Sequence, residues 1–255
     1  MSACIQTHVE AGVPMVYSLC SWGSDEPWTY GPKIANSWRV SADQQPLWES
    51  VMRSVDNTKA ALLHAAPGGW NDLDELFMVK GPMSYIERQT MFNLWTILAA
   101  PLSIGDNVVA LADDPKALAL YTNKEVIAIN QDVLGKPGVK ILGEDLCVGG
   151  GLGELQWVEV WARPLADGDV AVLLFNRGSW GGCTACAASL LGCACVGIDF
   201  SDIARLVGQP QWATANVSAR FVWNHTDASD IYTGSMPPAI LEPHESLLVR
   251  LRLVK

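Results

Sequence analysis

NSWRVSAD (residues 36–43) combines an apolar centre with a polar end, and the spacing of apolar residues changes directly after it. The new spacing predicts a helix over residues 45–64, because apolar side chains there recur at helical intervals. These side chains are Leu47, Trp48, Val51, Met52 and Val55. A strand that ends near Asp43 and leads into a helix is one βα unit, which is typical of a parallel sheet.

Strands of the same kind lie on both sides of this unit. VPMVYSLC (13–20) is an apolar, partly β-branched run that predicts a strand buried on both faces. GGWNDLDEL (68–76) and PLSIGDNV (101–108) are the next short strands along the chain. Helical segments separate these strands, so the first part of the chain predicts four βα units.

Two local signals place the helices. Ser84 and Glu87 have the spacing of a capping box ahead of a helix, and Pro115 suits the first position of another. Four units are half of a closed (β/α)₈ barrel, which needs roughly 250 residues. We therefore expect residues 1–136 to form a partial (β/α)₈ TIM barrel with two open sheet edges. Residues 1–12 are typical of the end of an amphipathic helix, lack a signal-peptide pattern and lead us to expect further sequence upstream.

From residue 137 the apolar pattern has a period of two, which is typical of half-buried strands. The segments that show it are LQWVEVWARPL, DVAVLLFN, FVWNHT and SLLVRLRLV, and turns rich in Gly, Pro and Asp separate them. This pattern predicts an antiparallel β-sandwich over residues 137–255. The expected fold class is thus α/β plus all-β.

Composition excludes several classes of partner. The chain has 17 Lys and Arg against 27 Asp and Glu, a formal net charge of −10, which disfavours nucleic acid and anionic membrane surfaces. No run of eighteen apolar residues occurs, so we expect no membrane span. An acidic chain with 11 Trp suits a neutral ring-shaped ligand such as a sugar, because indole faces stack on pyranose C–H faces.

Several motifs resemble one family of enzymes. YSLCSWG (17–23), NSWRVSAD, GGWNDLDEL and VIAINQD (126–132) occur in the order and spacing of the α-galactosidases of glycoside hydrolase family 27, especially its fungal-type members. The segment from VWARPL onward is similar to the C-terminal sandwich of that family. The resemblance implies that the partial barrel contains strands five to eight of the eight strands in the family.

The resemblance implies a retaining glycosidase that removes terminal α-linked galactose from a carbohydrate substrate and needs no cofactor. It also implies an aspartate nucleophile in a KYDNC-like motif and an acidic pair on strand two, and no such block occurs in these 255 residues. We therefore expect the chain to be inactive by itself. A noncatalytic sugar-binding remnant or a truncated gene product is the alternative from another class.

Asp43 resembles the acid/base residue of the family. An aspartate just past a strand end also lies on the face where parallel α/β folds carry out chemistry. The alternative is a solvent-facing Asp43 that caps a helix. Arg39 resembles the arginine that binds a sugar hydroxyl beside the acid/base, and a surface salt bridge is its alternative role.

Asp72 and Asp74 point the same way if their segment is a strand, because side chains there alternate with a period of two. By resemblance, Asp74 touches the sugar ring and Asp72 is structural. Without the resemblance, a solvated acidic cluster or a cation site is the more common reading.

By resemblance, the residue type at position 21 affects substrate specificity. Relatives with Glu or Asn at this position bind the galactose 2-hydroxyl, whereas relatives with Ser, and a small residue three positions later, accommodate a 2-acetamido group. Ser21 and Ser24 are both small, so α-N-acetylgalactosaminidase activity stays an alternative. The motifs around them resemble those of fungal-type α-galactosidases, which favours galactose as the substrate sugar. Trp22 is a further candidate substrate-binding residue, whereas we expect Trp38 to pack in the core.

Cys20 is expected to be a buried thiol, because Ala35 stands where animal relatives carry its partner cysteine. A second group of cysteines has a spacing that could chelate zinc, form two disulfides or mark an insertion, and no metal site is predicted from it. The group consists of Cys183, Cys186, Cys193 and Cys195.

The remaining signals are weaker. Asn216 and Asn224 fit the N-glycosylation pattern, which matters only in a secretory route. The structural histidines are expected to be His64, His225 and His244. By resemblance the protein is secreted or lysosomal/vacuolar, and a homodimer is one expected oligomeric state.

Overall fold

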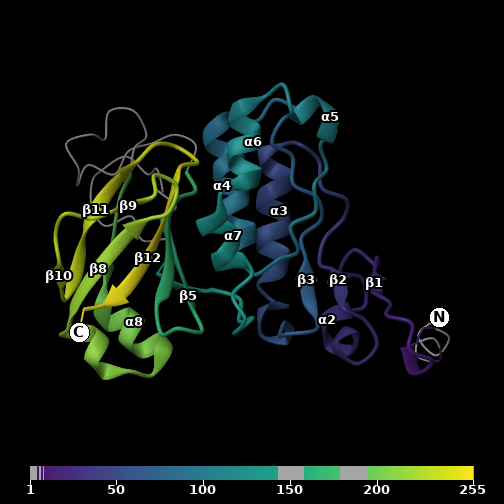
Figure 1. Cartoon of the computed structure of the whole chain (residues 1–255), viewed down its shortest axis with the longest axis horizontal. Helices are drawn as coiled ribbons and strands as arrows, with labels where there is room; N and C mark the ends of the chain where they lie inside the picture. Colours follow the sequence, from purple (N-terminus) through teal and green to yellow (C-terminus); the bar gives the residue numbers. More distant parts are fainter. Residues whose placement is uncertain (1–4, 6, 8, 143–157, 179–193, 255) are drawn as a thin grey trace, which may run out of the picture.

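The parallel strands form the outer layer of a three-layer molecule in the computed structural model, which describes all residues except 1–4, 6, 8, 143–157, 179–193 and 255 (Figure 1). A layer of helices follows, and an antiparallel sandwich lies beyond the helices. Helices cover the parallel strands on the side that faces the sandwich (Figure 1). The described residues contain no helix that is long and apolar enough to cross a membrane.

The parallel sheet consists of three short strands in chain order, β1 (Ser18–Leu19), β2 (Ser37–Arg39) and β3 (Trp70–Asp72). Both pairs are parallel, with Leu19 opposite Trp38 and Arg39 opposite Asp72. A fourth parallel segment is reduced to one bridge between Leu76 and Ile104. This arrangement confirms the expected βα units, whose strands all end at one edge of the sheet.

Two strand predictions are wrong in extent. Only Ser18–Leu19 of the expected strand 13–20 is paired, and Val16 is 86% exposed rather than buried on both faces. The physical reason is that β1 is an edge strand with β2 as its one partner in the described sheet. The expected strand 101–108 ends at the Ile104 bridge, because Asn107 caps the short helix α5 (Val108–Leu111).

The helices of the middle layer are α3 (Trp48–Thr58), α4 (Tyr85–Ile97), α6 (Pro115–Thr122) and α7 (Lys124–Asn130). The capping box is confirmed, since Ser84 Oγ accepts a bond from Glu87 N and Glu87 Oε2 accepts one from Ser84 N. Pro115 is the first residue of α6, as predicted.

The helix predicted over residues 45–64 is shorter than expected. α3 begins only at Trp48, because Leu47 has an extended backbone and Gln45 N donates to Ser50 Oγ instead of entering the helix. After Thr58 the chain turns, and Leu62–His64 form a separate 3-10 helix. Two shorter elements precede β2 in the chain; they are α2 (Pro27–Tyr30) and the 3-10 turn Gly31–Lys33.

The sandwich contains one large antiparallel sheet and one two-stranded sheet. The large sheet has the order β10-β8-β12-β6-β5-β4, and β9 pairs with β8. Its strands are β4 (Val139–Leu142), β5 (Val158–Pro164), β6 (Val170–Asn176), β8 (Asn216–Phe221), β9 (Thr226–Asp227), β10 (Tyr232–Thr233) and β12 (Ser246–Leu253). The second sheet pairs β7 (Ala194–Asp199) with β11 (Ser235–Leu241), and α8 (Phe200–Val207) and the 3-10 turn Pro210–Ala213 follow β7. The strand expected at FVWNHT is wrong in part, because β8 ends at Phe221 and a turn follows.

Both faces of β6 are buried, which explains its continuous apolar sequence. Leu173 and Phe175 belong to the core shared with the helices, whereas Val172 and Leu174 belong to the core inside the sandwich. Alternate side chains of one strand therefore join the two halves of the molecule.

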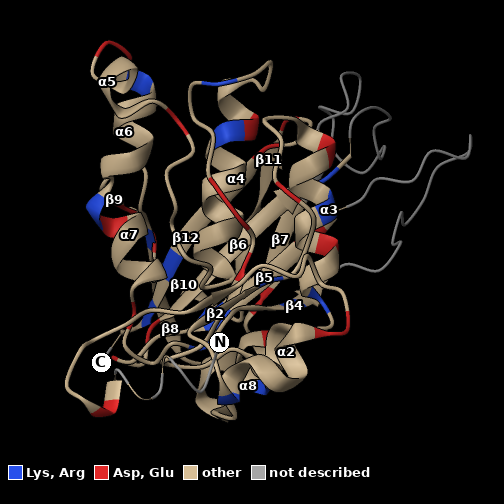
Figure 2. Cartoon of the chain, turned by 90° about the vertical axis from the view of Figure 1, so that its right-hand side faces the viewer, with Lys and Arg blue, Asp and Glu red and all other residues tan. Residues whose placement is uncertain are grey.

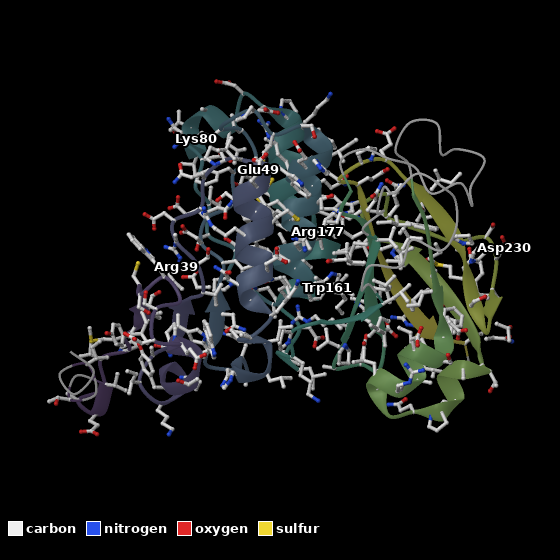
Figure 3. All side chains as sticks on the ribbon, turned by 180° about the vertical axis from the view of Figure 1, so that it is seen from behind. Arg39, Glu49, Lys80, Trp161, Arg177 and Asp230 are labelled. Atoms are coloured by element: carbon white, nitrogen blue, oxygen red, sulfur yellow. The ribbon has the colours of Figure 1, made fainter. Side chains whose placement is uncertain are left out.

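Polar contacts reinforce the contact between helices and sandwich. Arg163 of β5 is fully buried and donates to the carbonyls of Thr96 and Asn130, at the ends of α4 and α7. Trp161 and Arg177 lie between the helices and the sheet (Figure 3). His225 contacts Glu125 and His244 contacts Glu87, both through Nδ1, consistent with the structural roles expected for them.

Candidate active site

The predicted site residues all lie at or just after the carboxyl ends of β1, β2 and β3, and side-chain contacts join three of them, Arg39, Asp43 and Asp74. Ser21 and Trp22 follow β1, Asp43 follows β2, and Asp74 follows β3, while Arg39 is the last residue of β2. Parallel strands that end at one edge place the residues after them side by side. Figure 3 shows Arg39 on the side of the molecule away from the sandwich.

Asp43 lies in the irregular segment between β2 and α3. Its side chain is 60% exposed, and its Oδ1 accepts a bond of 3.2 Å from Arg39 Nη2. The helix-capping role is wrong, because the N-cap residue of α3 is Leu47. The carboxyl group of Asp43 is therefore open to solvent and oriented by a cation.

Arg39 joins two carboxylates. Its Nη2 lies 2.7 Å from Asp74 Oδ2 as well as 3.2 Å from Asp43 Oδ1, and its side chain is only 8% exposed. A surface salt bridge does not describe this residue, since its guanidinium is buried. Its Nε is buried without a hydrogen-bond partner among the described residues.

Asp74 does not continue strand β3. The strand ends at Asp72, and the backbone of Asp74 has a φ of 75°, in the left-handed region. The expectation that Asp72 and Asp74 follow strand alternation is therefore wrong. Asp72 Oδ1 instead accepts a bond of 2.8 Å from Asp74 N, which stabilises the turn. Burial raises the pKa of Asp72, while this hydrogen bond and the charge of Arg39 oppose the increase.

The segment after β1 folds closely against β2. Gly23 N donates to Arg39 O, and a Cβ on Gly23 would lie 2.6 Å from Val40 O, so only glycine fits there at a φ of 83°. Trp22 precedes it with a φ of 56° and is 53% exposed. Ser21 Oγ is buried without a hydrogen-bond partner in the described part of the chain.

Cys20 and Trp38 differ in burial. Cys20 is exposed rather than buried, because it stands at the open edge strand, and Arg39 Nη1 lies 4.0 Å from its sulfur. Trp38 packs in the core as predicted, fully buried, with Nε1 donating to Asn71 Oδ1.

Sequence patterns missed two residues that shape the site. Gln44 N donates to Asp74 Oδ2 at 2.7 Å, and Trp95 Nε1 donates to Asp74 O at 2.9 Å. Neither residue has a distinctive sequence signal, since a backbone amide is common to every residue type and Trp95 belongs to an ordinary apolar helical stripe.

No group of three or more His, Cys, Asp or Glu side chains with the geometry of a metal site occurs among the described residues. Cys183, Cys186 and Cys193 lie outside those residues, and only the backbone of Cys195 is described, in β7.

A pocket of about 520 Å³ lies at the other end of the parallel strands. Its lining includes Trp70, the first residue of β3, together with Leu102, Asn130 and Asp132. Asp43 and Asp74 follow the carboxyl ends of their strands, so this pocket is separate from the candidate site.

Two family models match the chain. A model described as alpha galactosidase A matches residues 2–132, and a model described as the alpha galactosidase C-terminal beta sandwich domain matches residues 156–251. These matches cover both architectural parts of the structure and agree with the motifs in sequence and position.

Individual relatives agree with the family models. Alpha-galactosidase 2 of Arabidopsis thaliana is 36% identical over 236 residues, which cover 92% of this chain and 51% of the relative. The alpha-galactosidase of Cyamopsis tetragonoloba is 36% identical over 222 residues, which cover 87% of this chain and 46% of that protein. The chain thus spans about half the length of the curated relatives it matches. The particular likeness to fungal-type members stays a prediction.

The fold is shared with a solved structure. Alpha-galactosidase from Saccharomyces cerevisiae with raffinose has a TM-score of 0.78 at 24% identity, and the match covers 99% of this chain and 67% of that one. The predicted fold class, a partial (β/α)₈ barrel followed by an antiparallel sandwich, is confirmed, and the chain belongs to the alpha-galactosidase family.

Proposed function

We propose that this chain carries the acid/base half of the active site of a retaining glycoside hydrolase that removes terminal α-linked galactose. The observation that carries the proposal is the exposed carboxyl group of Asp43, held by Arg39 at the carboxyl edge of parallel strands. A retaining glycosidase needs a proton donor beside the glycosidic oxygen and a second carboxylate roughly 5 Å away. The exposed carboxyl group of Asp43 is within reach of a bound substrate, and its contact with Arg39 orients it.

Each residue has a chemical role in this proposal. Asp43 protonates the departing glycosidic oxygen and then removes a proton from the incoming water. Arg39 and Asp74 bind sugar hydroxyl groups, Trp22 offers an exposed indole face to the sugar ring, and Ser21 borders the 2-position. These steps require no cofactor.

The two other carboxylates at this edge of the sheet each use one oxygen to hold the protein backbone or Arg39. Asp74 Oδ2 contacts Arg39 and Gln44 N, and Asp72 Oδ1 accepts a bond from Asp74 N, so we assign both a supporting role rather than that of nucleophile. The sequence contains no KYDNC-like block. We therefore infer that a complementary polypeptide segment supplies the attacking carboxylate, and that these 255 residues alone do not hydrolyse α-galactosides.

The test uses the purified chain with phenyl and dinitrophenyl α-galactosides, alone and co-expressed with the half of the Arabidopsis relative that it does not match. We expect no turnover alone and turnover after co-expression. Asp43→Asn should reduce phenyl α-galactoside hydrolysis by roughly 10² to 10⁴, and the dinitrophenyl substrate less, because its leaving group needs no proton. Asp230→Asn, on the sandwich, is the matched control.

Two results would contradict the proposal. Turnover by the chain alone would place the nucleophile within these residues. Undiminished turnover of both substrates by the co-expressed Asp43→Asn variant would remove Asp43 from the chemistry.

Two observations favour different substrates for the site. The yeast relative was solved with raffinose, which favours an α-galactoside. The small pair Ser21 and Ser24 favours a 2-acetamido sugar, because neither fills the space beside the 2-position. Comparing kcat/KM of the co-expressed enzyme on aryl α-galactoside and aryl α-N-acetylgalactosaminide decides between them. Binding of galactose by the chain without turnover in either preparation would indicate a sugar-binding remnant.

A neutral carbohydrate partner agrees with the surface charge. In Figure 2, Asp and Glu are spread over the helices and loops, and Lys and Arg are scattered among them.

The compartment and the oligomeric state of the protein stay predictions, namely a secreted or vacuolar location and a homodimer. Asn216 and Asn224 are exposed, so glycosylation of protein from a eukaryotic secretory host would support the first, and sedimentation would test the second.

A further inference from the structure

One oxygen of Asp74 binds the protein on both sides of Asp43. Asp74 Oδ2 lies 2.7 Å from Arg39 Nη2 and 2.7 Å from Gln44 N. Arg39 stands four residues before Asp43, and Gln44 stands directly after it. The other oxygen, Oδ1, makes no hydrogen bond to the residues that the structure describes, and is left for a ligand.

Asp74 is itself held firmly. Its N–H donates to Asp72 Oδ1, and its carbonyl accepts a bond from Trp95 Nε1, whose ring is fully buried in α4. Its backbone lies in the left-handed region, with a φ of 75°, and these two bonds hold it there. The position of the Asp74 carboxylate is therefore set by β3 and α4.

Fewer hydrogen bonds hold Asp43 than hold Asp74. Its carboxyl group is 60% exposed and has Arg39 as its one hydrogen-bond partner among the described residues, at 3.2 Å. Its backbone carbonyl accepts a bond from Arg53 Nη2, and no helix or strand includes it. The place of this carboxyl group thus depends on what holds Arg39 and Gln44.

We propose that Asp74 is a positioning residue for Asp43, and that it acts by fixing Arg39 and the Gln44 amide through one carboxylate oxygen. The two contacts of Arg39 are unequal: the shorter and less exposed contact with Asp74 orients Arg39, and Arg39 then orients the exposed Asp43. This role is additional to any contact that Asp74 makes with sugar. It rests on the proposed function only in that Asp43 is the acid/base.

The test is NMR of the isotope-labelled full chain without any sugar, with Asp74→Asn, Asp74→Ala and Asp43→Asn compared. Asn keeps an oxygen acceptor for Gln44 N and removes the charge, whereas Ala removes both. We expect the Gln44 amide proton to shift upfield in the order wild type, Asn, Ala. Its hydrogen exchange should accelerate on the order of tenfold in Asp74→Ala.

The Arg39 guanidinium gives the second readout. Its rotation about the Cζ–Nε bond is hindered while Asp74 holds it, so rotation should become faster in Asp74→Asn and stay slow in Asp43→Asn. Asp25→Asn, an exposed carboxyl group on the segment after β1, is the matched control and should change neither signal.

Three results would overturn the proposal. The first is an unchanged chemical shift and exchange rate of the Gln44 amide in Asp74→Ala. The second is faster rotation of the Arg39 guanidinium in Asp43→Asn but not in Asp74→Asn. The third is failure of both Asp74 variants to fold. None of these readouts involves turnover. If the co-expressed enzyme fails to hydrolyse α-galactosides while the NMR results hold, the proposed function fails and the positioning role stands.

Discussion

Asp72 is a carboxyl group whose ionisation is opposed by its surroundings. Burial raises its pKa above the ordinary value of 3.8, although the bond from Asp74 N and the charge of Arg39 favour the ionised form. A carboxyl group with a raised pKa in the folded state binds its proton more tightly there than in the unfolded state. Asp72 therefore stabilises the fold most at low pH, and this contribution is lost as pH rises through the folded-state pKa.

Asp72→Asn tests this sign. The variant keeps an oxygen that accepts the bond from Asp74 N and removes the buried charge. We expect its melting temperature to exceed that of the wild type by a few degrees at pH 7, with the difference shrinking as pH falls toward 3.8. Thermal unfolding of both proteins across this range measures the difference. A wild type that gains stability relative to the variant as pH rises would contradict the prediction.

At the scale of elements, the Asp106 side chain holds the segment after β3 by hydrogen bonds. Asp106 lies two residues after Ile104, which forms the bridge of the fourth parallel segment. Its buried carboxylate accepts bonds from the backbone N–H groups of Met78, Val79 and Lys80. The Tyr121 hydroxyl shares its one proton between Asp106 Oδ2 and Leu76 O. Burial raises the pKa of the Tyr121 phenol, and the Asp106 charge adds to the effect. Because every neighbour donates, only an acceptor-only group satisfies this position.

Asp106→Asn should therefore destabilise the fold although it preserves shape. An Asn amide would present two N–H groups where the surrounding groups are donors, and we expect a loss of about 2–3 kcal/mol in the free energy of unfolding. Urea unfolding measures this loss. Asp113→Asn, an exposed neighbour, is the control and should stay within about 0.5 kcal/mol of the wild type. Equal stability of the two variants would show that the backbone amides find other partners.

At the scale of the whole molecule, one continuous core joins the partial barrel to the sandwich. Trp161, Leu173, Phe175 and Leu248 of the large sheet share a core with the helices. Arg163 crosses the same boundary, and burial lowers its pKa to about 10, so it stays protonated at neutral pH. We infer that the two parts unfold as one unit.

Arg163→Met should weaken this unit. The substitution leaves the carbonyls of Thr96 and Asn130, at two helix C-termini, without their cationic donor, at a cost of about 2–3 kcal/mol. Differential scanning calorimetry should show one transition for the wild type, and a lower or divided transition for the variant. Arg205→Met, with a 75% exposed side chain, should leave the transition unchanged. Two separate transitions in the wild type would contradict the coupling of the two parts.

The order of elements could be predicted from local patterns, and their lengths could not. The capping box of Ser84 and Glu87 and the first position of Pro115 depend on neighbours in the chain, so the sequence contains them in full. The extent of the strand near Val16 and of the segment around Ile104 depends on which strands lie beside them. Apolar runs alone do not report such partners.

The sequence by itself determined the succession of βα units and antiparallel strands, the family, and the candidate residues Asp43, Arg39 and Asp74. The tertiary structure alone decided that these side chains meet at one guanidinium, that Cys20 is exposed, and that Asp74 turns out of its strand to bind Gln44 N. The physical reason is range: capping, periodicity and motif spacing act between near neighbours in the chain. Burial and hydrogen bonding at the site arise between strands about thirty residues apart, which only the folded chain brings together.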